Sequence, residues 1–76
     1  MLNGDLANAQ AEALARRLET EGGPDVRKQI DLGYRLAIGR AARPKEIQVA
    51  VDYLKTEPKR GFALMLLNLN SFVYVN

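Results

Sequence analysis

Proline and glycine residues divide this chain into four segments, and these breaks limit the available folds more than any other feature. Breaks occur at residues 22–24, 39–44 and 56–60, and each contains one of the 3 prolines. The residue before a proline is pushed away from helical angles, and glycine tolerates the left-handed conformation that closes a helix. Between the breaks, apolar residues recur at three- and four-residue spacing, which is typical of amphipathic helices. The pattern predicts an all-α fold without a sheet.

The segments between the breaks predict four helices, over residues 5–19, 25–38, 44–55 and 60–69. Asn3 or Asp5 can cap the first helix, since either side chain accepts a hydrogen bond from free backbone N–H groups. Asp25 opens the second helix, and Gly39 stands where its C-terminal cap belongs. Pro44 suits the first position of the third helix, and Glu46 can reach back to its start. Residues 71–76 are expected to be extended, because a lone strand gains little. We therefore predict a small four-helix bundle, orthogonal or up-and-down, with a short extended C-terminal tail.

The expected core collects the inner apolar positions of the last three helices: Ile30, Leu36, Ile47, Val51, Leu54, Leu66 and Leu69. Val49 and Tyr53 lie beside this stripe on the third helix. Gly33 costs about 0.8 to 1 kcal/mol of helix propensity relative to Ala, which is tolerable where two backbones approach closely. Gly33 is therefore predicted to be a helix contact point. Asn68 and Asn70 are expected to cap the last helix or to bond to the backbone of the tail.

The chain has 76 residues, about half of a typical domain. We expect residues 1–76 to form a single helical domain, and we interpret it as a fragment of a larger multidomain protein. Folding should bury about 62% of the extended surface, so the stability is expected to be modest. The unbroken apolar run at residues 62–67 is far shorter than the ~20 residues of a membrane span, and no signal-peptide pattern opens the sequence. The compartment stays unknown.

Cysteine and histidine are both absent, which removes thiol nucleophiles, thiolate metal sites and the usual general base. The carboxylate pairs Glu19 with Glu21 and Asp52 with Glu57 lie beside Lys or Arg, so solvated surface charge accounts for them better than acid–base chemistry. Neither a calcium-type loop nor a glycine-rich phosphate loop occurs. We therefore predict no enzyme activity, no cofactor, no metal site and no small-molecule ligand.

The middle of the chain is basic, because nine of the 11 Lys and Arg residues lie between residues 27 and 60. The candidate interaction surface consists of Arg35, Arg40, Arg43, Lys45, Lys55, Lys59 and Arg60. Four carboxylates are interspersed among them and weaken the local field. This favours a solvated surface, or contact with an acidic partner domain, over nucleic-acid binding. The alternative function is a nucleic-acid-binding helical domain.

Residues 2–18, 30–54 and 66–75 resemble the C-terminal part of the planctomycete PSD domain, the domain-of-unknown-function family numbered fifteen fifty-three. The shared motifs are a leucine–asparagine opening, a Tyr-Arg-Leu-Ala core, a Pro-x-Glu helix start and a Leu-Leu-Asn-x-Asn ending, here at Leu2 and Asn3, Tyr34 to Arg40, Pro44 to Glu46 and Leu66 to Tyr74. This chain departs from the family at Arg43, where Thr or Ser is usual, and at Ser71, where Glu is usual.

The resemblance implies a C-terminal module of large, exported or cell-envelope-associated proteins that often carry cytochrome-c-like domains upstream. It implies no known activity, and the haem-attachment motif is absent from these residues. The leading prediction is therefore a non-catalytic helical packing or protein-interaction module, whose partner is another domain of the parent chain or a separate protein.

Overall fold

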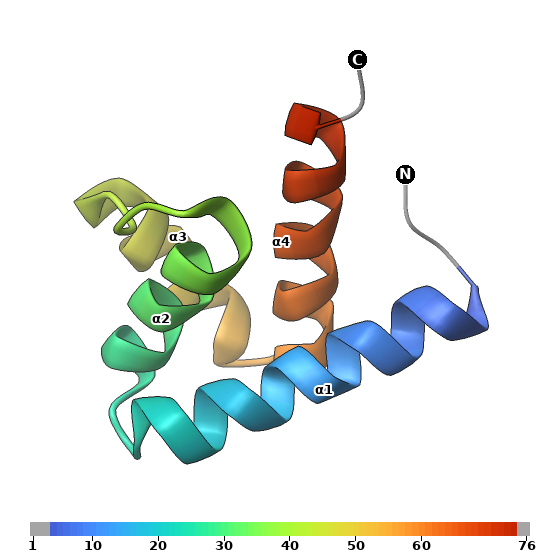
Figure 1. The fold of residues 1–76 in the computed structure, drawn as a ribbon. Coiled ribbons are helices and arrows are strands. Elements are labelled where there is room, and N and C mark those ends of the chain that lie inside the picture. The colour runs from blue at the N-terminus through green and yellow to red at the C-terminus, as the bar shows by residue number, and fades with distance from the viewer. Residues whose placement is uncertain (1–3, 75–76) are drawn as a thin grey trace.

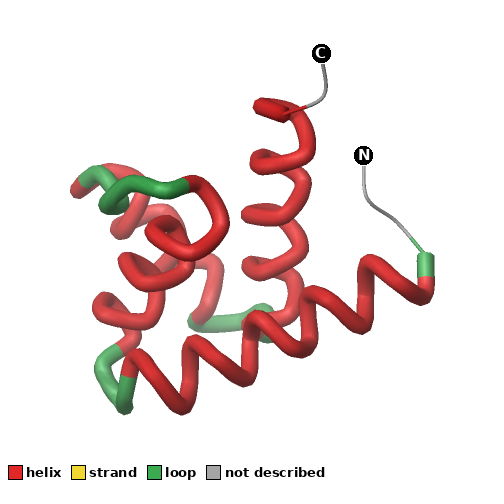
Figure 2. The backbone as a smooth tube through the Cα atoms, viewed as in Figure 1, coloured by secondary structure: helices red, strands yellow, loops and turns green. Residues whose placement is uncertain are grey.

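The computed structural model describes the backbone of residues 4–74 and the side chains of residues 4–70. The described chain forms four helices: α1 (Asp5–Gly22), α2 (Val26–Ile38), α3 (Pro44–Leu54) and α4 (Lys59–Tyr74). Helix α1 runs along the base, α2 and α4 rise from the same side of it, and α3 lies beside α2 (Figure 1). Helices fill most of the chain and short loops join them, with no strand in residues 4–74 (Figure 2). The predicted all-α four-helix fold is confirmed, in its orthogonal form.

Helix α1 differs from the prediction at both ends. It continues three residues further than expected, to Gly22, because Gly23, with φ 74°, is the first residue to leave the helical conformation. Gly4, with φ 91°, occupies the N-cap position and no side chain caps the helix, so the predicted capping role of Asp5 is wrong. Asp5 instead lies in the first turn, where a carboxylate meets the positive end of the helix dipole. Asn3 lies outside the described residues.

Helix α4 also differs, because it continues to Tyr74. The predicted extended tail is therefore wrong over residues 71–74, and residues 75–76 lie outside the described part. Adding residues to an existing helix gains one backbone hydrogen bond per residue, whereas a strand needs a neighbouring strand. The β-forming character of the last residues therefore does not decide their conformation. Asn68 and Asn70 lie inside α4 rather than at its end, so their predicted capping role is wrong as well.

The predicted caps of α2 and α3 are confirmed. Asp25 accepts a hydrogen bond from the Arg27 N–H at 2.9 Å and starts α2. Gly39 ends α2 in the left-handed conformation, with φ 82°, and its N–H bonds to the Tyr34 carbonyl at 3.0 Å. Pro44 is the first residue of α3, and the Glu46 carboxylate accepts the backbone N–H of Arg43 at 2.8 Å.

The main core lies where α1, α2 and α4 meet, and its fully buried large side chains are Leu18, Ile30 and Leu66. Ile30 and Leu66 confirm the prediction. The predicted members Ile47, Val51 and Leu54 are partly buried and pack against this core. Leu36 and Leu69 are 40% and 41% exposed, so their assignment to the core is wrong. The predicted core set did not include the rings of Tyr34 and Phe62, which are buried and meet at a centroid distance of 6.2 Å.

Small residues allow the helices to approach closely. Ala11 and Ala15 of α1 pack against Ala63 of α4 in a second buried cluster. A side-chain carbon at Gly33 would lie 2.8 Å from the Leu66 δ-carbon and 3.3 Å from the Phe62 ring, too close for either neighbour to keep its place. The predicted contact role of Gly33 is confirmed. None of the helices in residues 4–74 combines the length and the apolar character that crossing a membrane requires.

The two leucines at positions 66 and 69 provide a matched test of this core. Leu66→Ala should lower the free energy of unfolding by roughly 2 to 5 kcal/mol, because Leu66 is fully buried and a cavity would remain. Leu69→Ala should cost clearly less, because that side chain is 41% exposed. Urea denaturation of both variants provides the measurement. Equal losses would contradict the packing of α4 described here.

Candidate interaction groove

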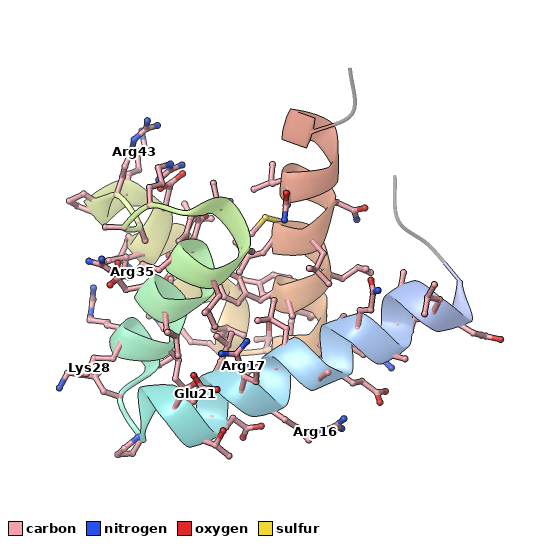
Figure 3. All side chains as sticks on the ribbon, in the orientation of Figure 1. Arg16, Arg17, Glu21, Lys28, Arg35 and Arg43 are labelled. Atoms are coloured by element: carbon pink, nitrogen blue, oxygen red, sulfur yellow. The ribbon has the colours of Figure 1, made fainter. Side chains whose placement is uncertain are left out.

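The predicted basic residues do not gather on one surface of the structure. Five of the seven also form ion pairs. Figure 3 places Arg35 and Arg43 on one side of the molecule, whereas Lys59 and Arg60 reach carboxylates of α1. The five pairs are Arg35–Asp31 at 2.7 Å, Arg40–Glu46 at 2.8 Å, Lys55–Asp52 at 3.2 Å, Lys59–Glu19 at 3.3 Å and Arg60–Glu12 at 3.5 Å. The positive charge of the middle segment is thus largely balanced locally.

Arg43 and Lys45 are the two predicted residues that differ. Within the described chain, no carboxylate oxygen lies within ion-pairing distance of either side chain, and both residues are exposed. Both also line a groove of about 650 Å³ that runs between α3 and α4. We call this depression the α3–α4 groove. Its volume lies within the range of ligand pockets in proteins.

The α3–α4 groove has a buried apolar floor and exposed apolar walls. Tyr34, Ala50 and Phe62 form the floor and are 4%, 5% and 2% exposed. The walls include three large apolar side chains that remain accessible, Val49 at 63%, Tyr53 at 39% and Met65 at 38% exposed.

The geometry of helix α3 explains why this face stays open. Ala50, on the inner side of α3, is its only fully buried residue among those described, and the partly buried Ile47, Val51 and Leu54 flank it. Val49 lies on a different side and therefore remains uncovered.

Gly61 permits the closure of one end of the groove. A side-chain carbon on Gly61 would collide with the Tyr53 hydroxyl, so Tyr53 lies directly against the first turn of α4. Tyr53 thereby joins the end of α3 to the start of α4. Any residue larger than glycine at position 61 would push the ring outward.

The other end of the groove is polar and is organised by Arg40. Its guanidinium holds the Glu46 carboxylate with two hydrogen bonds, of 2.8 and 2.9 Å, and it also bonds to the Ala41 carbonyl. It lies 5.4 Å from the centre of the Tyr34 ring, within the range of cation–π contacts. Arg40 thus ties α2, the connection and the start of α3 together.

Asp31 fixes the same connection from the other side. One of its oxygens accepts the Ala42 N–H at 2.9 Å, and the other accepts the Arg35 guanidinium at 2.7 Å. These two bonds lower the pKa of Asp31 below its ordinary value, the Arg35 contact being the larger cause. The connection that carries Arg43 is therefore held by two carboxylates, Asp31 and Glu46.

The titration behaviour of the groove follows from these contacts. The hydrogen bonds from Arg40, reinforced by the Arg43 N–H, lower the pKa of Glu46 to about 2. Burial raises the pKa of Tyr34, and the nearby Glu46 carboxylate adds to the increase. At neutral pH the Tyr34 phenol is therefore neutral, and the Glu46 carboxylate is ionised and bound by Arg40.

The groove provides accessible apolar surface with two cations at one end, Arg43 and Lys45, that form no ion pair among the described residues. In residues 4–74 no three carboxylates gather in a way that would hold a metal ion. No family model, curated protein or solved structure matches this chain. The resemblance to the planctomycete PSD domain stays a prediction.

The cations of this site were predicted from the sequence, whereas its apolar part was not. Lys45, Val49 and Tyr53 are spaced four residues apart and follow one face of α3. This second apolar face, beside the core stripe, is the signal that could have revealed the groove. It was not decisive, because spacing alone does not show which of two apolar faces another helix covers.

Glu46→Gln should destabilise the protein near pH 7, and the effect should fade in acid. The folded pKa of Glu46 is about 2, below its ordinary value of 4.5, so its contribution is fully present above about pH 4.5. It is lost as the pH falls through 4.5 toward 2. The measurement is the free energy of unfolding of both proteins, by urea denaturation at several pH values from about 7 to about 2.

Glu57→Gln is the control for this experiment, because Glu57 is exposed and forms no ion pair among the described residues. It should change the free energy of unfolding little near pH 7. A constant difference between wild type and Glu46→Gln across the pH range would show that the Arg40–Glu46 pair does not contribute as described.

Proposed function

We propose that this chain is a non-catalytic helical module that binds a protein partner, or another domain of its parent protein, through the α3–α4 groove. The observation that carries the proposal is the convergence of Val49, Tyr53 and Met65, all exposed, on one groove. Apolar surface gains roughly 25 cal/mol for each Å² removed from water, so covering this groove is favourable. Exposed apolar patches rimmed by polar residues are typical of interaction sites.

The proposed setting is a larger, exported or envelope-associated planctomycete protein, of which this chain is a C-terminal module. The resemblance in residues 2–18, 30–54 and 66–75 supports this setting. In such a protein the groove has an upstream domain or a separate protein as its partner. The module then contributes binding, and any chemistry belongs to other domains.

The alternative, nucleic-acid binding, has less support from the charges. Five of the seven predicted basic residues are paired with carboxylates, which leaves Arg43 and Lys45 as the unpaired members of that set in the described chain. Ordinary non-specific binding uses several phosphate contacts from a continuous basic face.

Duplex DNA should therefore bind no more tightly than about 10 μM near 0.15 M salt. Fluorescence anisotropy with a labelled duplex at several salt concentrations provides the measurement. Submicromolar binding with a steep salt dependence, abolished by Arg40→Glu with Arg43→Glu, would favour the alternative function over the proposed one.

A selection experiment tests the proposed groove directly. A displayed library of amphipathic helices, varied on one face, should yield peptides that bind this protein. Val49→Glu should weaken the selected peptides at least about tenfold, since a charge would then face their apolar side. Leu6→Glu is the matched control, because Leu6 is also a largely exposed apolar residue, at 73% against 63% for Val49, and lies outside the groove.

The selected peptides are measured by titration calorimetry, and the fold of both variants is checked by circular dichroism. Retained binding to Val49→Glu, or a selection that yields no peptide, would contradict the proposed function. A loss confined to Leu6→Glu would move the binding surface to α1.

A further inference from the structure

We propose that the α3–α4 groove recognises an amphipathic helix that carries a carboxylate one turn away from an apolar anchor residue. The carboxylate is held by Arg43, Lys45 and the Tyr34 hydroxyl, and the anchor enters beside Val49 and Met65. This inference rests on the proposed function and names the chemistry of its partner.

The charges at the groove determine which charge a partner should carry at its polar end. Arg43 and Lys45 line its polar end, and the one carboxylate that lines the groove among the described residues, Glu46, is already bound by Arg40 through two hydrogen bonds. The side chains of Arg43 and Lys45 have no carboxylate partner in the described chain. An acidic group on the partner would complement this charge, whereas a basic one would be repelled.

The Tyr34 hydroxyl provides an independent indication of a polar ligand group. Tyr34 lines the groove and is 4% exposed, yet its hydroxyl makes no hydrogen bond among the described residues. It is not sealed in the core either, because Gln29 Oε1 is the only sealed side-chain atom without a partner in residues 4–70. This hydroxyl is not sealed and belongs to a ring that lines the groove, so it can donate a hydrogen bond to a group that enters there.

The spacing along α3 sets the spacing on the partner. Lys45, Val49 and Tyr53 lie four residues apart, so they form one stripe with a rise of about 6 Å, slightly more than one helical turn, between neighbours. A helix that lies along this stripe meets the cation first and the apolar wall one turn later. Its acidic residue and its apolar anchor must then be three or four residues apart, because that spacing places two side chains on one face.

The exposure of the groove favours a helix as the occupant. Val49 is 63% exposed, so the groove is open along the α3 side and a small molecule would remain largely in contact with water. A helix brings its own surface to cover the exposed walls.

The test uses the peptides from the library selection described above. They should be enriched in Asp or Glu three or four residues from an apolar anchor, relative to the unselected library. For the tightest peptide, replacing this acid by Gln should weaken binding about tenfold, since a hydrogen bond to a charged group contributes roughly that factor.

Substitutions in the groove should change peptide affinity in a way that matches the peptide variants. Tyr34→Phe retains the buried ring and its contacts and should weaken the acidic peptide about tenfold, but not its Gln variant. Tyr53→Phe removes a hydroxyl at the other end of the groove and is the control. Arg43→Glu with Lys45→Glu should reverse the preference, so that a peptide with Lys in place of the acid binds more tightly. Lys28→Glu, an exposed cation outside the groove, should leave the preference unchanged.

The outcomes separate this inference from the proposed function. If Val49→Glu abolishes binding but the peptides show no acidic preference and Tyr34→Phe has no effect, the groove binds helices and the inference is wrong. If Val49→Glu has no effect, the proposed function itself is wrong. Concentration-dependent dimerisation in sedimentation that Val49→Glu removes would identify a second copy of this chain as the occupant and would also overturn the inference.

Discussion

The missing side chain at Gly33 is the constraint on which the rest of the structure depends. It allows α2 to approach α4 so closely that the Leu66 side chain and the Phe62 ring occupy the space above it. Phe62 thereby reaches the Tyr34 ring, and these two rings form the floor of the α3–α4 groove. A larger residue at position 33 would displace the Leu66 side chain and the Phe62 ring, and would thereby change the groove as well as the core. The low helix propensity of glycine is offset here by packing that no other residue would permit.

The α2–α3 connection converts this packing into a binding surface. Arg40 stacks on Tyr34 and holds Glu46, and Asp31 holds the backbone of Ala42. These contacts fix the start of α3 at the polar end of the groove. They also bind the carboxylates of Asp31 and Glu46, and Arg43 at the rim forms no ion pair among the described residues. The same interactions therefore stabilise the connection and leave the charge that the proposed partner would meet.

Ion pairing explains why a basic sequence segment does not form a basic face. Lys59 and Arg60 reach Glu19 and Glu12 on α1, some forty to fifty residues away in the sequence. Exposed pairs of this kind contribute little to stability, but they cancel charge at close range. The prediction of an interaction surface from charge alone therefore included residues whose charge is balanced by a distant helix. What remains is a small positive rim beside a larger apolar groove.

The sequence by itself determined the helices and most of their caps. Helical starts and stops depend on neighbouring residues, so Asp25, Gly39 and Pro44 could be assigned from local chemistry alone. It did not determine which apolar residues are buried, as the exposed Leu36 and Leu69 show, nor that residues 71–74 continue α4. Tertiary structure decided these points, and it decided that one face of α3 stays open. Burial and charge compensation depend on contacts between segments distant in sequence, which periodicity and composition do not contain.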